Sequence, residues 1–243
     1  MSIGNKVMKF QSPVLSKDII IIVGSYGSGK SEIAVNLARF FASHPPSSEK
    51  SIAIADLDIV NPYFRSREAA SVLEKLGIRA INPKGGQFYA DIPIILPEIK
   101  GAIEHNEGIL ILDVGGDDVG AKVLSSLNNA FIHDTYELLL VLNANRPFTS
   151  DMEGCLKMIK NIETASRLKV TGIISNTHLM ENTTPEIIMK GLELSQAVSK
   201  NTKLPLSFLS ATAHDLKKID INSIDIPVLP LNRLLLKPWE KKD

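Results

Sequence analysis

Short, almost purely apolar runs recur along this chain of 243 residues, and stretches with the apolar spacing of a helix follow most of them. Strands of a parallel sheet have this composition because the helices of their crossover connections cover both faces of the sheet. The alternation therefore predicts an α/β fold with three layers, in which helices flank a doubly wound, mostly parallel sheet. The predicted strands are residues 18–23, 51–56, 108–114, 136–143, 168–175, 204–210 and 226–231.

The composition is that of a globular protein with a sizeable core, since 44% of the residues are hydrophobic. We expect one domain over residues 18–243, after an N-terminal extension of residues 1–17. Lys plus Arg and Asp plus Glu number 27 each, so no overall positive charge attracts nucleic acid or an anionic membrane. The single cysteine, Cys155, cannot form an internal disulfide, and no apolar run has the length of a membrane span. We expect a cytoplasmic protein that binds neither nucleic acid nor membrane.

The segment after the first predicted strand matches the phosphate-binding pattern G-x-x-x-x-G-K-[ST], and an amphipathic helix is predicted after it, over residues 31–43. Glycines let the backbone wrap closely around a polyphosphate, so that its N–H groups and a helix N-terminus point at the anion. Lys30 is predicted to reach the β- and γ-phosphates, and the Ser31 hydroxyl to bind Mg²⁺. The alternative is an ordinary glycine-rich turn. The predicted nucleotide-binding residues of this loop are Gly24, Ser25, Tyr26, Gly27, Ser28, Gly29, Lys30 and Ser31.

Carboxylates end two further predicted strands. Asp56 and Asp58 close the second strand, and Asp113 closes the third, shortly before Gly116. The carboxyl ends of parallel strands meet at one edge of the sheet, so these carboxylates are expected beside the phosphate loop, where they can orient Mg²⁺ and water. Gly116 is predicted to present its backbone amide to a γ-phosphate. The alternative for the aspartates is helix capping.

Residues 78–101 interrupt the alternation with prolines and a Gly-Gly pair, and we expect an irregular excursion there between two crossover units. Phe88, Tyr89 and Asp91 in this segment either line a second site for a substrate or partner, or pack against the sheet. The five histidines lack metal-ligand spacing, but His178 lies close enough to Asn176 in the sequence to border a nucleotide.

Four motifs in combination resemble the MinD, ParA and CobQ/CobB group of P-loop proteins of the SIMIBI class: "GSYGSGKS", "DLD", "ILILDVGG" and "TGIISNTHL". The resemblance implies an ATP-dependent protein in which Asp58 helps to position the hydrolytic water and Asp56 and Asp113 lie near Mg²⁺. Asn176 corresponds to the base-binding asparagine of the group. A guanine-specific Asn-x-x-Asp motif would need an aspartate where this chain has Leu179, so adenine is favoured.

The chain departs from this group at Ser25, because MinD and ParA members carry a lysine directly after the first glycine of the loop. We therefore expect slow hydrolysis, or a cation supplied from elsewhere. Arg146 is the best placed of the candidate cations, because its loop follows a predicted strand and opens on the ligand edge. The alternative is a solvated surface arginine. The other candidates are Arg65, Arg67 and Lys84.

Three functions remain open. The first is a slow ATPase that binds Mg-ATP and acts as a regulatory or assembly switch for an unidentified protein partner, with a homodimer as one option. The second is an ATP-dependent kinase or ligase that acts on a small-molecule acceptor, and the third is a nucleotide-binding module with negligible turnover. We favour the first, because no acceptor-binding constellation stands out. Cys155 falls in a predicted helix and not in the turn that a nucleophile would need.

Overall fold

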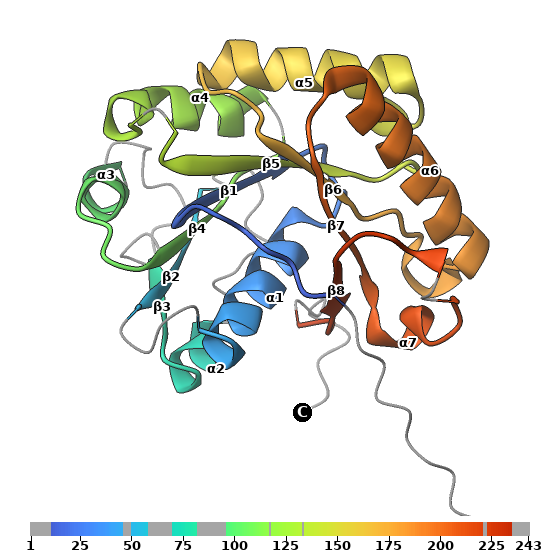
Figure 1. The fold of residues 1–243 in the computed structure, drawn as a ribbon. Coiled ribbons are helices and arrows are strands. Elements are labelled where there is room, and N and C mark those ends of the chain that lie inside the picture. The colour runs from blue at the N-terminus through green and yellow to red at the C-terminus, as the bar shows by residue number, and fades with distance from the viewer. Residues whose placement is uncertain are drawn as a thin grey trace, which may run out of the picture.

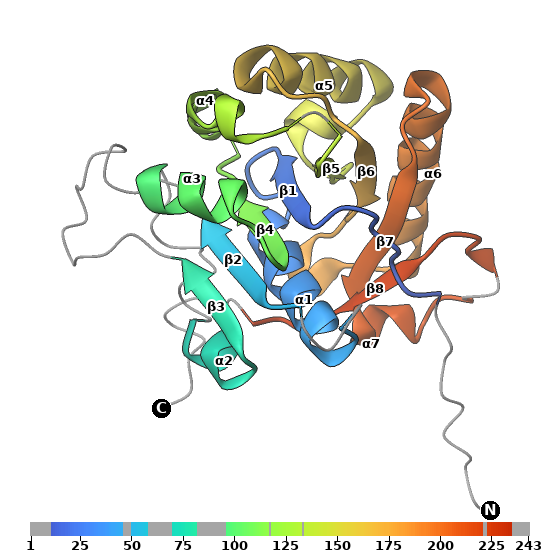
Figure 2. The ribbon, with the colours of Figure 1, turned by 60° about the vertical axis from the view of Figure 1, so that its left-hand side comes forward.

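The structure is a computed structural model that describes residues 11–45, 50–57, 70–81, 96–116, 118–132, 134–220 and 223–234. Its centre is an eight-stranded parallel sheet with the strand order β3-β2-β4-β1-β5-β6-β7-β8 (Figures 1 and 2). The strands are β1 (Ile19–Gly24), β2 (Ile52–Asp56), β3 (Ile78–Ile81), β4 (Ile109–Asp113), β5 (Tyr136–Leu142), β6 (Gly172–Ser175), β7 (Leu206–Thr212) and β8 (Val228–Leu231).

Helices cover both faces of this sheet, which confirms the predicted α/β class (Figure 2). The α-helices are α1 (Lys30–Ser43), α2 (Ala70–Lys75), α3 (Leu96–Glu104), α4 (Asp118–Ser126), α5 (Met152–Ser166), α6 (Pro185–Thr202) and α7 (Ala213–Leu216). Short 3₁₀ helices are η3 (Asn128–Ala130), η4 (Pro147–Thr149) and η5 (Met180–Asn182).

Strand β1 shows how the sequence forms the central layer. Ile19, Ile21 and Val23 pack into the core beneath α3, α4, α5 and α6. Ile20 and Ile22 point the other way, into the core beneath α1 and α2. Because successive side chains of a strand face opposite sides of the sheet, a run that is apolar at every position is buried on both faces. A third, smaller cluster joins α6, α7, β7 and β8.

Each of the predicted strand runs contains a strand, but the irregular segment was predicted wrongly at both ends. Residues 78–81 form β3, and α3 begins at Leu96. Strand β3 lies at the edge of the sheet, where Ile78 and Ile81 are buried and Arg79 is exposed. An edge strand this short carries no continuous apolar run, so its sequence resembles a loop. Residues 82–95, which include Phe88, Tyr89 and Asp91, lie outside the described residues.

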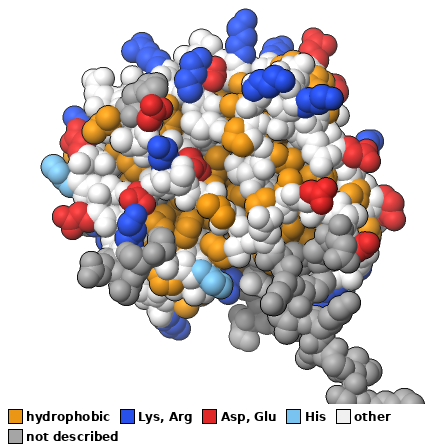
Figure 3. Space-filling model, viewed as in Figure 1, with side chains coloured by type: hydrophobic (Ala, Val, Ile, Leu, Met, Phe, Trp, Pro, Cys, Tyr) orange, Lys and Arg blue, Asp and Glu red, His pale blue; other side chains and the backbone are white. Residues whose placement is uncertain are grey.

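The described part of the N-terminal segment lies against the sheet. The Gln11 carbonyl accepts a hydrogen bond from the Val228 amide at 2.9 Å, and the Ser16 amide donates to Glu137 Oε1 at 2.7 Å. Acidic and basic side chains are both spread over the face in Figure 3, as expected from a formal net charge of zero. None of the described helices is long and apolar enough to cross a membrane.

Candidate functional site

The glycine-rich loop connects β1 to α1 at the carboxyl edge of the sheet. Gly29 caps α1 with φ of 92°, a left-handed conformation that glycine adopts without the steric cost of a Cβ atom. The loop closes on itself through the Ser28 amide, which donates to the Ser25 carbonyl at 3.1 Å. The structure thus places the predicted loop between a buried strand and a helix N-terminus, as the phosphate-binding pattern requires.

Lys30 and Gly116 meet over this loop. Lys30 is 7% exposed, and its Nζ donates to the Ser25 carbonyl at 3.0 Å. A Cβ atom on Gly116 would lie 2.6 Å from Lys30 Nζ and 2.9 Å from the Tyr26 amide nitrogen. The loop after β4 can therefore approach the phosphate loop this closely only because position 116 has no side chain.

The predicted metal-binding carboxylates end adjacent strands. Asp56 and Asp113 are paired in the parallel register of β2 and β4, and each is 1% exposed. Carboxylates buried to this extent need a cation or several hydrogen bonds, and oxygen ligands are those that Mg²⁺ prefers. Ser31, the third predicted ligand, lies in the first turn of α1. Asp58, the predicted water-positioning residue, lies outside the described residues.

The loop also carries two buried hydroxyls that suit an anionic ligand. Ser25 is 1% exposed and Ser28 is fully buried, and neither hydroxyl has a hydrogen-bond partner in the described part of the chain. Buried polar groups are almost always hydrogen-bonded, so these hydroxyls fit a site that a phosphate group completes. Among the described residues, no group of three or more His, Cys, Asp or Glu side chains is arranged to hold a metal ion. A bound Mg²⁺ would thus depend on Ser31 and on phosphate oxygens as well as on the two aspartates.

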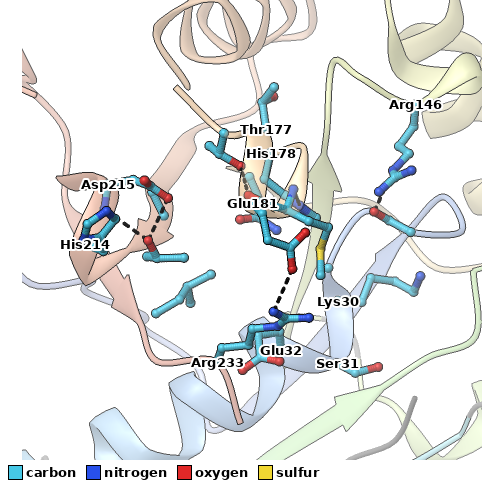
Figure 4. A pocket seen from close by; sticks show the side chains of 18 of the residues that line it. Lys30, Ser31, Glu32, Arg146, Thr177, His178, Glu181, His214, Asp215 and Arg233 are labelled. Atoms are coloured by element: carbon cyan, nitrogen blue, oxygen red, sulfur yellow. Dashed lines mark hydrogen bonds and ion pairs between the residues drawn. The ribbon is translucent and has the colours of Figure 1, made fainter. Parts of the chain in front are cut away.

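A cavity of about 560 Å³ extends from the phosphate loop to the loops that follow β6, β7 and β8 (Figure 4). A volume of this order is typical of sites for small molecules and cofactors. Its polar and charged lining residues are Tyr26, Lys30, Ser31, Glu32, Arg146, Asn176, Thr177, His178, Glu181, Thr183, Thr212, His214, Asp215, Lys218 and Arg233.

Asn176 joins the phosphate loop to the sheet. Its Nδ2 donates to the Ser28 carbonyl at 2.8 Å, and its Oδ1 accepts from Ser210 Oγ on β7 at 3.0 Å. The side chain is 3% exposed, and a Cβ atom on Gly29 would collide with its Nδ2. The sequence predicted a contact with a base, and this linking role was not foreseen. The base contact stays a prediction.

His178 lies on the same side of the loop. Burial, followed by the positive charges of Arg146 and Arg233, lowers the pKa of His178 from 6.5 to about 4. Its Nδ1 lies 3.5 Å from the Met180 amide nitrogen and accepts from it, an arrangement that favours the tautomer with the proton on Nε2. Nε2 would be 3.4 Å from a Cβ atom on Gly29. The ring is therefore a neutral hydrogen-bond donor beside the phosphate loop at pH 7.

The far wall of the cavity contains functional candidates that the sequence analysis missed. Arg233 Nη1 forms an ion pair with Glu181 Oε1 at 3.0 Å across the cavity (Figure 4). Asp215 accepts from Thr212 Oγ1 at 2.7 Å and pairs with Lys218 Nζ at 3.1 Å. These residues lie at or after the carboxyl ends of β6, β7 and β8. The sequence could have indicated them only through topology, because the segments after parallel strands lie at the same sheet edge as the phosphate loop.

The segment after β8 is held against α1. Asn36 and Asn232 exchange two hydrogen bonds, from Asn36 Nδ2 to the Asn232 carbonyl at 2.9 Å and from the Asn232 amide to Asn36 Oδ1 at 2.8 Å. The Leu234 amide donates to Glu32 Oε1 at 2.6 Å. These bonds hold the backbone that carries Arg233 against α1, at the edge of the cavity.

Arg146 is the one candidate cation that lies within the described residues; Arg65, Arg67 and Lys84 lie outside them. Its Nε donates to the Gly27 carbonyl at 2.8 Å, so its guanidinium lies directly against the phosphate loop. Cys155, by contrast, is fully buried in α5, and burial followed by the charge of Asp151 raises the pKa of its thiol to about 12. A thiol in that environment is not a nucleophile at neutral pH.

No protein-family model and no curated protein matches this chain. Solved structures do match. The cell division protein FtsY from Thermotoga maritima is 22% identical, with a TM-score of 0.54, over 89% of this chain and 70% of that one. The signal recognition particle 54 kDa protein from Aeropyrum pernix, in complex with GDP, is 18% identical with a TM-score of 0.55, over 86% of this chain and 44% of that one. Chloroplast FtsY from Physcomitrella patens is 16% identical with a TM-score of 0.53, over 88% and 66%.

The fold is that of a P-loop protein. These neighbours belong to the SIMIBI class, and for this chain that class stays a prediction. At these identities the likeness extends to the fold alone. The MinD and ParA type, named from the motifs, is not confirmed by it and stays a prediction.

Proposed function

We propose that this protein binds Mg-ATP in the cavity beside the phosphate loop and is a slow ATPase that acts as a regulatory or assembly switch for a partner protein. The observation that carries the proposal is the approach of Lys30 and Gly116 to the Gly24–Gly29 turn, from which Gly27, Gly29 and Lys30 line the adjoining cavity. An ordinary glycine-rich turn needs neither a buried lysine nor a second glycine loop packed against it.

The chain's own groups are arranged to hold a polyphosphate. Backbone amides of the loop and the N-terminus of α1 are proposed to bind the phosphate oxygens. Lys30 Nζ, which donates to the Ser25 carbonyl in the free protein, is proposed to donate to the β- and γ-phosphates when nucleotide is bound. Ser31, Asp56 and Asp113 are proposed to hold Mg²⁺, which would neutralise phosphate charge when bound. Asp58 is proposed to orient the attacking water.

We favour adenine, because Leu179 stands where a guanine-specific motif needs an aspartate. Three carboxylates line the cavity and are potential acceptors for guanine N–H groups. Asp215 is engaged by Thr212 and Lys218, Glu181 by Arg233, and Glu32 by the Leu234 amide. The neighbour from Aeropyrum pernix was solved with GDP, so GTP must be tested beside ATP.

The proximity of Gly116 to Lys30 and Tyr26 gives the switch a physical basis. A γ-phosphate held by Lys30 would contact the Gly116 amide, and its loss after hydrolysis would release that contact. The loop after β4 would then differ between the triphosphate and diphosphate states, and a partner protein reading this loop would distinguish them.

Phosphate release and hydrogen exchange test this proposal together. The purified chain with Mg²⁺ should release phosphate slowly from ATP, and not from GTP, and Lys30→Ala should abolish the release. The amides of residues 114–116 should exchange more slowly with a non-hydrolysable ATP analogue than with ADP. Equal exchange in the two states would contradict the switch, and ADP release that requires an added small molecule would instead identify a kinase or ligase.

A further inference from the structure

We infer that Arg146 is a built-in phosphate-binding cation, whose guanidinium contacts the polyphosphate held by the loop and stabilises the charge that develops during hydrolysis. The inference rests on the proposed nucleotide site and names a further residue of it. Arg146 follows β5, far from the phosphate loop in the sequence, and the fold brings the two together.

The position of Arg146 is fixed at both ends of its side chain. At the backbone, the Arg146 amide donates to the Asn143 carbonyl at 3.0 Å, and the Arg146 carbonyl accepts from the Thr149 amide at 3.0 Å. Thr149 Oγ1 also donates to the Asn143 carbonyl at 2.8 Å, and the Ala144 amide donates to Thr177 Oγ1 at 3.0 Å. At the tip, Nε is held by the Gly27 carbonyl. A guanidinium held in this way loses little conformational entropy when it binds a phosphate.

The part of the guanidinium that recognises anions is left available. Nε is used by Gly27, while the described residues provide no hydrogen-bond partner or carboxylate for the two terminal NH₂ groups. A Cβ atom on Gly27 would be 3.0 Å from the guanidinium carbon, so a side chain at position 27 would push Arg146 away from the loop. Paired terminal NH₂ groups form the fork that binds phosphate in a bidentate manner.

The local charge also favours an anionic ligand. Arg146 and Lys30 line the same cavity beside one loop, whereas Arg233 and Lys218 in its lining are paired with Glu181 and Asp215. The field of Arg146 is strong enough to contribute to the lowered pKa of His178. Both cations contact the phosphate loop, Lys30 at the Ser25 carbonyl and Arg146 at the Gly27 carbonyl, so a polyphosphate held by this loop would be attracted by both charges.

The step that Arg146 would assist is ATP hydrolysis. Water forms a bond to the γ-phosphorus while the bond from that phosphorus to the β–γ bridging oxygen breaks. The electron pair of the broken bond stays on ADP, and the proton of the water passes to phosphate or solvent. Negative charge accumulates on oxygens around the γ-phosphorus during this exchange, and a fixed cation lowers its energy.

Three substitutions separate the charge of Arg146 from its structural bond to Gly27. Arg146→Gln places an amide nitrogen at the position of Nε and can keep the hydrogen bond without the charge, Arg146→Lys keeps the charge, and Arg146→Ala removes both. Arg79→Ala on the exposed face of β3 is the matched control. Phosphate release is measured for each, with calorimetric affinities for ADP and for ADP with aluminium fluoride, an analogue of the transferring phosphate.

Phosphate release should fall at least about 100-fold in both the Ala and Gln variants, less in the Lys variant, and not in the control. In the Ala and Gln variants, affinity for ADP with aluminium fluoride should fall more than affinity for ADP. If phosphate release is too slow to measure, the ratio of these two losses tests the inference by itself. Recovery by Gln, or equal losses for both ligands, would mean a structural role and overturn the inference. If the unchanged protein binds no nucleotide, both the proposed function and this inference fail. If every variant binds ADP and ADP with aluminium fluoride as tightly as the unchanged protein does, only the inference about Arg146 fails.

Discussion

Replacing Asn176 tests the construction of the site in depth, because this side chain joins the phosphate loop to β7. Asn176→Ala removes the bond from Nδ2 to the Ser28 carbonyl and leaves that carbonyl unsatisfied, which costs about 1–3 kcal/mol in a buried position. It also removes the bond from Ser210 Oγ to Oδ1. Ser210 keeps a second partner in the Ser175 carbonyl at 3.3 Å, so this loss is smaller, about 0.5–1 kcal/mol. We expect the free energy of unfolding to fall by about 1.5–4 kcal/mol in total.

Urea denaturation of the nucleotide-free protein measures this change. Asn161→Ala, on the exposed side of α5, is the matched control and should stay within about 0.5 kcal/mol of the unchanged protein. A double-mutant cycle with Ser210→Ala should give a coupling energy above about 0.5 kcal/mol, because the two side chains share a hydrogen bond. If Asn176→Ala costs no more than the control, or if the two substitutions are additive, the link between loop and sheet does not exist as described.

Three further predictions follow from the same region. The pKa of His178 is about 4 in the folded state and about 6.5 in the unfolded chain, so between these pH values the unfolded chain binds more protons. The free energy of unfolding should therefore fall by about 2 kcal/mol from pH 7 to pH 5. Urea titrations of His178→Asn should no longer show this fall. Gly29→Ala should destabilise the protein by more than Gly77→Ala. Both glycines have positive φ, but an added Cβ atom would meet a neighbour, Asn176, only at position 29. Similar thermal unfolding of the two variants would contradict the close contact between Gly29 and Asn176. Asn36→Ala should speed hydrogen exchange at the Asn232 amide at least about tenfold, and unchanged exchange would mean that the segment after β8 is held by other contacts.

The sequence predicted the fold and the position of the glycine-rich loop at the carboxyl edge of the sheet, and that this loop binds phosphate stays a prediction. Apolar runs buried on two faces identify strands of a parallel sheet, and such a sheet brings the carboxyl ends of its strands to one edge. The register that pairs Asp56 with Asp113 follows from that arrangement. The phosphate loop is a local pattern within consecutive residues, so it could be read without knowing the fold.

The other walls of the cavity could not be predicted from local sequence patterns, because their contacts join segments that are distant in the sequence. Glu181 and Arg233 are 52 residues apart, and neither lies in a recognisable motif. Asn176 was recognised, but its bond to Ser28 depends on how close β6 comes to the phosphate loop. Strand β3 was missed because an edge strand needs little apolar surface.

The position of Arg146 could be predicted only in part from the sequence. Its loop was expected at the ligand edge because it follows a strand, which is an inference from topology. Its bond to the Gly27 carbonyl depends on side-chain geometry that topology does not determine. Ser25, at the position where MinD and ParA loops carry a lysine, is buried, and Arg146 beside the loop lies in the segment after β5.

The central claim is that the loop from Gly24 to Ser31 binds the phosphates of Mg-ATP, and titration calorimetry tests it most directly. The unchanged protein, Lys30→Ala and the exposed-lysine control Lys160→Ala are titrated with ATP and GTP in the presence of Mg²⁺, and thermal unfolding shows that each variant is folded. The account predicts that ATP binds to the unchanged protein and to the control, and that folded Lys30→Ala binds it at least about 100-fold more weakly. Equal affinity in folded Lys30→Ala, or no binding of either nucleotide to the unchanged protein, would contradict it.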